Sequence, residues 1–167
     1  MNYMRSAIAA ASVSLMASLA WAQSGTMSAQ DFATTAASSD MLEIQTSNVA
    51  LQKSSSAAVK EFAQMMINDH TKASSELKMA AQKDGVTIPT AMLEKHAATV
   101  EKLNGTAAGA FDAAYIDAQV NAHKEAVALM MSYAQTGEAP ALKAHAQKTA
   151  PIIQMHLQHA QQLMKAQ

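Results

Sequence analysis

Residues 57–83, AAVKEFAQMMINDHTKASSELKMAAQK, decide the fold of this 167-residue chain. Small or apolar side chains recur along the stretch at intervals of seven residues, which places them on one face of an α-helix. They form two neighbouring series, Val59, Met66, Ala73, Ala80 and Ala63, His70, Leu77. Serines precede the stretch and Asp84-Gly85 follows it, as is typical of a helix start and a helix stop. The stretch therefore predicts one long helix with a buried face.

The rest of the chain carries helix signals of the same kind. A capping-box pattern begins at Ser28 and a second at Asp40, which predicts a short lead-in helix and then a helix to about residue 52. Three further helices are predicted, from Pro89 to Gly105, from Ala107 to Tyr133, and from Pro140 to Leu163 with a kink at Pro151. Four main helices with two short accessory helices predict an all-α four-helix bundle.

The first 22 residues have the pattern of a secretory signal peptide. A short positive start is followed by an apolar run and then by the small-residue cleavage pattern Ala20-Trp21-Ala22. The alternative is a membrane anchor, but the run is shorter than the roughly 20 residues that span a bilayer. We therefore expect cleavage near Ala22, a periplasmic or secreted protein without a transmembrane span, a lead-in at residues 23–39 and a helical domain at residues 40–165.

Composition argues against several classes of function. The chain has 12 basic and 13 acidic residues with no basic cluster, which disfavours nucleic-acid binding. It has no cysteine, so it has neither disulfides nor a lipid-anchoring cysteine. There is no Gly-x-Ser-x-Gly motif and no glycine-rich phosphate loop. A binding or structural protein is therefore favoured over an enzyme.

Three histidines fall on the apolar faces of three predicted helices. These are His70, His123 and His156, and the first main helix adds Glu43 between Leu42 and Ile44. Helical bundles build metal sites from such inward-facing side chains on different helices. Imidazole and carboxylate groups suit zinc, iron or copper. The sequence thus predicts a candidate site for a single transition metal ion. The alternative is a buried hydrogen-bonded network without metal.

Other polar residues are expected to lie around these four. Asp69 precedes His70 and so points about 100° away from it, which suits a residue that supports a ligand from outside or lies at the surface. Asp112 and Gln119 lie on the same side of their helix as His123. His159 fits either the site or an exposed edge. Two further histidines, His96 and His145, are predicted to face solvent.

Five segments between residues 40 and 165 form a further pattern, MLEIQTSNVALQKS, VKEFAQMMINDH, GVTIP, FDAAYIDAQVNAH and APIIQMHLQHAQQL. In their order and spacing they resemble DUF4142, an exported bacterial family of unknown function. The resemblance implies a ferritin-like helical bundle, and members are often labelled outer-membrane proteins. It also places Tyr115 in the same motif as His123. It implies no settled activity.

Two departures bear on the type of metal site. Gln45 stands where the family often has a second acid. A ferritin-like di-iron site also needs Glu-x-x-His on two helices, whereas the residues three places before the histidines are Ile67, Val120 and Ile153. A mononuclear site, or none, is therefore expected. The functional hypotheses are an exported metal-binding bundle protein or metal carrier, a metal-dependent oxidoreductase, and a stress-related structural protein without metal.

Overall fold

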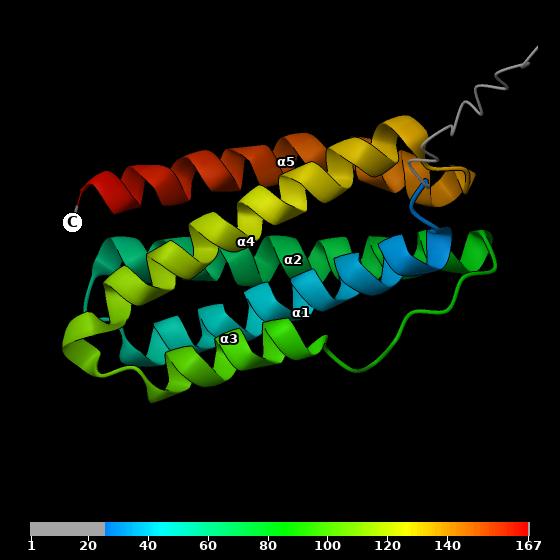
Figure 1. Ribbon diagram of the computed structural model, residues 1–167. Helices are drawn as coiled ribbons and strands as arrows, with labels where there is room; N and C mark the ends of the chain where they lie inside the picture. The colour runs from blue at the N-terminus through cyan, green and yellow to red at the C-terminus, as the bar shows by residue number, and fades with distance from the viewer. Residues whose placement is uncertain (1–25, 167) are drawn as a thin grey trace, which may run out of the picture.

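The computed structural model describes residues 26–166, and all of its regular secondary structure in that range is helical (Figure 1). The predicted all-α class is confirmed. The predicted signal peptide lies outside the described residues. The helices are α1 (Ala29–Lys53), α2 (Ala57–Lys83), α3 (Glu94–Gly105), α4 (Ala108–Thr136) and α5 (Pro140–Lys165).

The four long helices pack in a ring, in which α1 contacts α2 and α4, and α5 contacts the same two helices. The shorter α3 lies along α1 and also touches α4 (Figure 1). Helices α2 and α4 run in the same direction, because the connection that contains α3 carries the chain back along the molecule (Figure 1). One long crossover of this kind is typical of ferritin-like bundles. The ring agrees with the predicted four-helix arrangement, and the ferritin-like relationship stays a prediction.

The predicted break between a lead-in helix and a second helix near Asp40 is wrong. Helix α1 continues through this point without interruption. Ser38 and Asp40 resemble cap residues in the sequence, but both side chains are buried and have partners on other elements. The Ser38 hydroxyl lies 2.6 Å from His96 Nδ1, and Asp40 Oδ1 lies 2.8 Å from His70 Nδ1. Tertiary partners therefore outweigh the local capping signal.

Helix α3 begins at Glu94, later than the start predicted at Pro89. The preceding residues are held on α1 instead. The Gln30 side-chain amide donates to the Thr87 carbonyl oxygen at 2.7 Å, and the Leu93 N–H donates to the Ser38 hydroxyl at 2.8 Å. The second bond satisfies a backbone N–H that a longer helix would have paired internally, with the Pro89 carbonyl. Helix α2 has the predicted bounds, and α5 continues through Pro151.

Two apolar clusters fill the ends of the bundle. Cluster A contains Phe62, and cluster B contains Phe32, which stacks on Tyr133 at a ring-centroid distance of 3.9 Å. The other buried members of cluster A are Val49, Ala50, Val59, Ala63, Met66, Leu103, Phe111, Tyr115, Ile116, Val120, Leu157 and Ala160. The other buried members of cluster B are Ala33, Ala36, Ala37, Leu77, Ala80, Ala81, Met130, Leu142 and Ala146. On each of the four long helices, buried polar residues lie between the part that belongs to cluster A and the part that belongs to cluster B.

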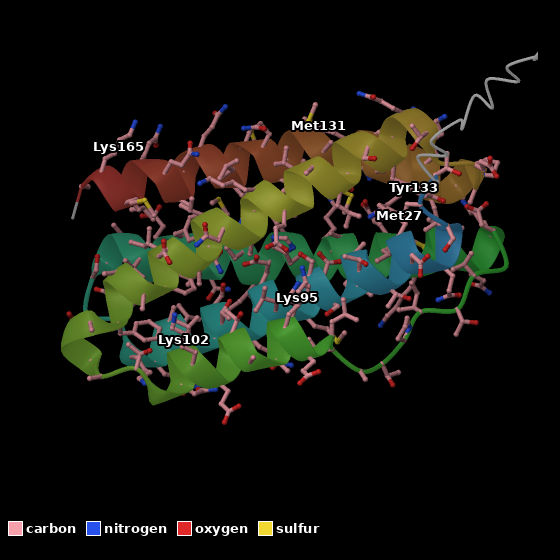
Figure 2. All side chains as sticks on the ribbon, viewed as in Figure 1. Met27, Lys95, Lys102, Met131, Tyr133 and Lys165 are labelled. Carbon is pink, nitrogen blue, oxygen red and sulfur yellow. The ribbon has the colours of Figure 1, made fainter. Side chains whose placement is uncertain are left out.

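Among the helices of residues 26–166, none is apolar enough over a sufficient length to cross a bilayer. Some methionines do face outward, such as Met131, which is half exposed on α4 (Figure 2). The apolar side chains that carry the fold are those of the two clusters.

Candidate metal centre

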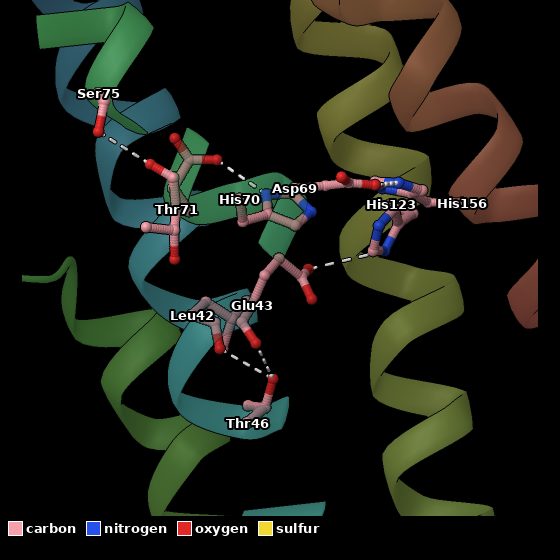
Figure 3. A network of polar contacts seen from close by, with 10 residues as sticks. Leu42, Glu43, Thr46, Asp69, His70, Thr71, Ser75, His123 and His156 are labelled. Carbon is pink, nitrogen blue, oxygen red and sulfur yellow. Dashed lines mark hydrogen bonds and ion pairs between the residues drawn. The ribbon is translucent and has the colours of Figure 1, made fainter. Parts of the chain in front are cut away.

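Helices α2, α4 and α5 each bring one histidine to the middle of the bundle. His70, His123 and His156 are all buried, and their ring centroids lie 5.5 to 5.7 Å apart (Figure 3). One ring nitrogen from each histidine lies within 4.8 Å of the other two. Three imidazoles from separate helices therefore meet at one point.

The helical register explains why these polar rings face inward. His70 stands seven residues from both Ala63 and Leu77, which are buried in clusters A and B. On α5, Ile153 and Ala160 similarly flank His156 on the buried side. Burial of the apolar neighbours stabilises the helix packing and forces the histidine on the same face into the interior.

Each histidine uses one ring nitrogen to bond to the surrounding protein. His70 Nδ1 lies 2.8 Å from Asp40 Oδ1, and His156 Nε2 lies 2.9 Å from Asp69 Oδ2 (Figure 3). His123 Nδ1 lies 2.9 Å from the carbonyl oxygen of Gln119. A carbonyl only accepts hydrogen bonds, so His123 Nδ1 carries the proton and Nε2 keeps a lone pair. Carboxylates and carbonyls orient metal-binding histidines in this way.

The second nitrogen of each ring is buried and has no partner. These atoms are His70 Nε2, His123 Nε2 and His156 Nδ1. A buried polar atom without a hydrogen bond costs free energy, about 1 to 3 kcal/mol in proteins. Three such atoms at one place form a set of nitrogen donors that a metal ion would satisfy.

Burial keeps His70 and His156 in the neutral form, which is the form of imidazole that binds metals. Burial lowers the pKa of His70 to about 4, although the charge of Glu43 acts in the opposite direction. Burial also lowers the pKa of His156 to about 4, and its hydrogen bond to Asp69 partly opposes this. Both imidazoles are therefore neutral at neutral pH, and a metal ion displaces no proton from the free nitrogen of a neutral imidazole in the matching tautomer.

Glu43 of α1 lies beside this cluster with an unsatisfied carboxylate. The residue is 1% exposed, and neither side-chain oxygen has a hydrogen-bond partner. Oε1 lies 3.6 Å from His123 Nδ1, which is longer than a hydrogen bond, and that nitrogen already donates to Gln119 (Figure 3). Glu43 is outside the close group of three nitrogens. Its carboxylate places negative charge next to the point where a cation would bind.

The unsatisfied polar atoms of the molecule concentrate here. Eight buried side-chain nitrogen and oxygen atoms of the described residues lack a partner, and five of them belong to Glu43, His70, His123 and His156. Native proteins leave few buried polar groups unpaired. Most of the exceptions share one location on four helices, so one cation bound there could satisfy several of them together.

Sequence reasoning missed Asp40 as part of this region. Asp40 is buried next to His70, and burial raises the pKa of its carboxyl to about 8, while the charge of His145 lowers it. Its place three residues before Glu43 puts both acids on one face of a helix. That spacing was the available signal, but the residue was interpreted as a helix cap.

The structure places the expected outer residues in two groups. Asp69 contacts His156, and Gln119 contacts His123 through its backbone oxygen while its amide donates to Thr46. Tyr115 and Asp112 make no hydrogen bond to the three histidines. The Tyr115 hydroxyl bonds to Ser47 at 2.8 Å, and Asp112 lines a cavity near the start of α2.

The prediction that His96 and His145 face solvent is wrong. Both are buried, with exposed fractions of 7% and 6%. His96 bonds to Ser38 and thereby ties α3 to α1, and His145 lies near the buried Asp40. Burial lowers the pKa of both imidazoles. Neither belongs to the close group of nitrogens, and His159 instead packs edge-on against Phe62.

Comparison with known proteins identifies the family. Residues 15–163 match the model of a family described as "Domain of unknown function (DUF4142)". The chain belongs to this family. No curated protein and no solved structure matches the chain. The predicted family is thus confirmed, and because its description gives no activity, the function has to be argued from the site.

Proposed function

We propose that this DUF4142 protein binds one transition metal ion through His70, His123 and His156. The observation that carries the proposal is the set of three buried imidazole nitrogens without partners, one from each of three helices. Each opposite nitrogen is already held by the protein, so the free nitrogens are fixed in direction. A ligand set prepared in this way costs little entropy when the ion enters.

The donors favour zinc, iron or copper. Imidazole nitrogens suit all three, and hard ions such as magnesium prefer oxygen ligands. Nitrogens around a tetrahedral zinc lie about 3.3 Å apart, given Zn–N distances of about 2.0 to 2.1 Å. The three histidine nitrogens lie within 4.8 Å of one another, so a small inward rotation of the rings completes the site. Glu43 supplies compensating negative charge beside the three histidines and leaves the fourth coordination position open.

A single ion fits the site better than a pair. Two-metal carboxylate sites use several glutamates that bridge or cap the ions. Here Glu43 is the one acid of the cluster whose oxygens are free, because Asp40 and Asp69 are both bonded to histidines. One divalent cation with three neutral imidazoles and one nearby carboxylate has a net charge of +1, whereas a second divalent cation would raise it to +3 without further acids to offset it.

Export of the protein is part of the proposal. The N-terminal pattern that ends at Ala22 supports cleavage and release to the periplasm or the exterior. Metal binding in that compartment suits a carrier or a protein that is stabilised by its metal. Intact-mass measurement of the exported protein tests this part, because cleavage predicts a chain that starts at Gln23. A dominant species that retains Met1 in the membrane fraction would contradict it.

A metal-dependent oxidoreductase is the second candidate, and one observation favours it. A small cavity between α2 and α5 is lined by His70 and His156, so the site is reached from one side. A closed structural site would not need such access. Both candidate functions, metal binding alone and metal-dependent oxidation or reduction, require that the ion binds.

Thermal unfolding of chelator-stripped protein tests metal binding. The protein is melted with zinc, copper, iron and manganese in turn. At a hundredfold excess over the dissociation constant, a ligand that binds only the folded state adds about 2.7 kcal/mol of stability, which is roughly 5 to 11 °C for a domain of this size. We expect this shift for zinc, iron or copper, and a smaller shift for manganese.

The matched variants are His123→Ala and His96→Ala. Both remove a buried histidine, but only His123 offers an unpartnered nitrogen to the site. The metal-dependent shift should disappear in His123→Ala and persist in His96→Ala. If no metal shifts the wild-type melt, or if the two variants respond alike, the histidines form a structural network and the proposal fails.

A further inference from the structure

A cavity of about 60 Å³ opens beside the histidine cluster, between α2 and α5. Its walls combine the two ligand residues His70 and His156 with apolar side chains that include Ala73, Ile152 and Ile153. The cavity continues to the surface past Asp69 and the ion pair between Glu76 and Lys148, whose charged atoms lie 2.8 Å apart. It leads from solvent to the side chains of His70 and His156, whose free nitrogens lie just behind the cavity wall and are buried.

The remaining ligands approach from other helices. Glu43 belongs to α1 and His123 to α4, and neither lines the cavity. A metal held by the three histidines therefore has the Glu43 carboxylate on its α1 side, and the cavity lies on the side of His70 and His156. Metal sites with three protein ligands keep a further position open for a ligand that comes from solvent.

We propose that the bound metal accepts a small ligand of two or three non-hydrogen atoms through this cavity. The inference rests on the proposed metal site and adds to it the class of molecule that the site takes. An apolar protein cavity of about 150 Å³ holds a benzene ring, whereas a water needs only about 10 to 15 Å³. A space of about 60 Å³ therefore admits a small linear molecule and excludes a ring.

Charge at the entrance does not select the ligand strongly. Two acids, Asp69 and Glu76, line the cavity together with two lysines, Lys72 and Lys148. These formal charges balance, so an anion and a neutral molecule meet no large electrostatic barrier. Size and affinity for the metal decide which molecule binds.

The test uses the full-length exported protein loaded with cobalt(II), with azide as the small probe and imidazole as the ring-sized probe. Metal content is measured first, so that loading is known independently of probe binding. Visible absorption of the cobalt ion then reports a change in its coordination as each probe is added. We expect azide to change the spectrum of the wild type with saturation and imidazole to leave it unchanged.

Two variants locate the path of the ligand. Ala73→Leu fills the cavity without removing a ligand residue, and Ala118→Leu is the matched control, because Ala118 lines a separate cavity beside α3. Overpacking should weaken azide binding about tenfold or more in Ala73→Leu. The control should bind azide as the wild type does. Ile152→Ala widens the cavity, and imidazole should then change the spectrum.

The outcomes separate this inference from the metal site itself. If cobalt loads fully but azide leaves the spectrum unchanged, the ligand cavity is refuted and the metal site stands. If azide binds equally to Ala73→Leu and Ala118→Leu, or if imidazole binds the wild type, access through this cavity is refuted. If cobalt does not bind to the stripped protein, both the site and its ligand cavity are refuted.

Discussion

The two ends of the bundle and its middle follow opposite rules. In clusters A and B, apolar side chains fill the interior around Phe62 and around the stacked pair of Phe32 and Tyr133. In the polar layer between them, Glu43, His70, His123 and His156 are equally buried but leave five atoms without partners. Burial of apolar side chains stabilises the two ends, whereas burial of polar atoms without partners in the middle costs free energy.

The difference indicates which part of the sequence serves folding and which serves a ligand. An apolar residue at His123 would fill the same space without the cost of an unpaired nitrogen. Proteins commonly accept such a loss of stability where a site has to bind something.

The largest effect is expected at the ends. Phe62 has no exposed surface and packs against Tyr115 and His159. Phe62→Ala should lower the free energy of unfolding by about 3 to 5 kcal/mol, because it removes a large buried side chain and leaves a cavity. Denaturant titration with and without metal measures this. The loss should be the same under both conditions, and a loss below about 1 kcal/mol would show that cluster A does not carry the fold.

The next effect is a dependence of stability on pH in the metal-free protein. Unfolded histidines take up protons near pH 6.5, whereas in the folded state burial holds the pKa of His70 and of His156 at about 4. The unfolded state thus binds more protons between these values, so their contribution is present above about pH 6.5 and is lost as the pH falls toward 4. The loss for one such group is about 3 kcal/mol.

Asp40 acts in the opposite direction at higher pH. Burial raises the pKa of its carboxyl to about 8, so its contribution is present at low pH and is lost as the pH rises from about 4 to 8. Two histidines outweigh one aspartate on the acid side, and stability should peak between about pH 6 and 7. Urea titrations from pH 4 to 9 test this. His70→Gln should flatten the acid side, and an unchanged profile in that variant would contradict the assignment.

Replacement of Glu43 is expected to raise the free energy of unfolding, by less than Phe62→Ala lowers it. Both carboxylate oxygens are buried without partners, so Glu43→Met should stabilise the metal-free protein by about 1 to 3 kcal/mol. The same variant should bind metal more weakly, because the compensating charge is lost. The free energy of unfolding and the metal affinity are measured on one sample. A variant that is destabilised without metal would show that Glu43 has a structural partner.

The smallest effect is expected at the surface. Lys95 and Glu125 form an exposed ion pair at 2.6 Å between α3 and α4, with both side chains more than half exposed. Lys95→Ala should change the free energy of unfolding by less than about 1 kcal/mol. Metal binding should not change. A loss comparable to that of Phe62→Ala would mean that α3 docks through this pair rather than through its apolar contacts and its tie to Ser38.

Periodicity was sufficient to predict the helices and the inward direction of three histidines, because a single buried face controls both. The heptad series around His70 fixes α2 and also turns the imidazole into the core. The partners of these rings were harder to predict. Asp40 was interpreted as a cap, since Asp is favoured at helix starts and its contact with His70 joins residues 30 positions apart.

The buried positions of His96 and His145 could not be predicted from local pattern. His96 is on the short helix α3. Which face of α3 packs against α1 depends on the path of the long connection between α2 and α4. His145 is near enough to Asp40 for the charge of Asp40 to raise its pKa against the larger lowering by burial, an interaction between the first and the last helix. Such pairings depend on which helices become neighbours, and the sequence pattern of one helix does not contain that information.

A crystal structure of metal-loaded protein with anomalous scattering at the metal edge would locate the ion and so decide whether the polar middle of the bundle is a metal site. We expect one ion bound to His70 Nε2, His123 Nε2 and His156 Nδ1 at about 2.0 to 2.1 Å. The opposite nitrogens should remain on Asp40, Gln119 and Asp69. An ion bound elsewhere, or histidine nitrogens bonded only to ordered water under saturating metal, would contradict it.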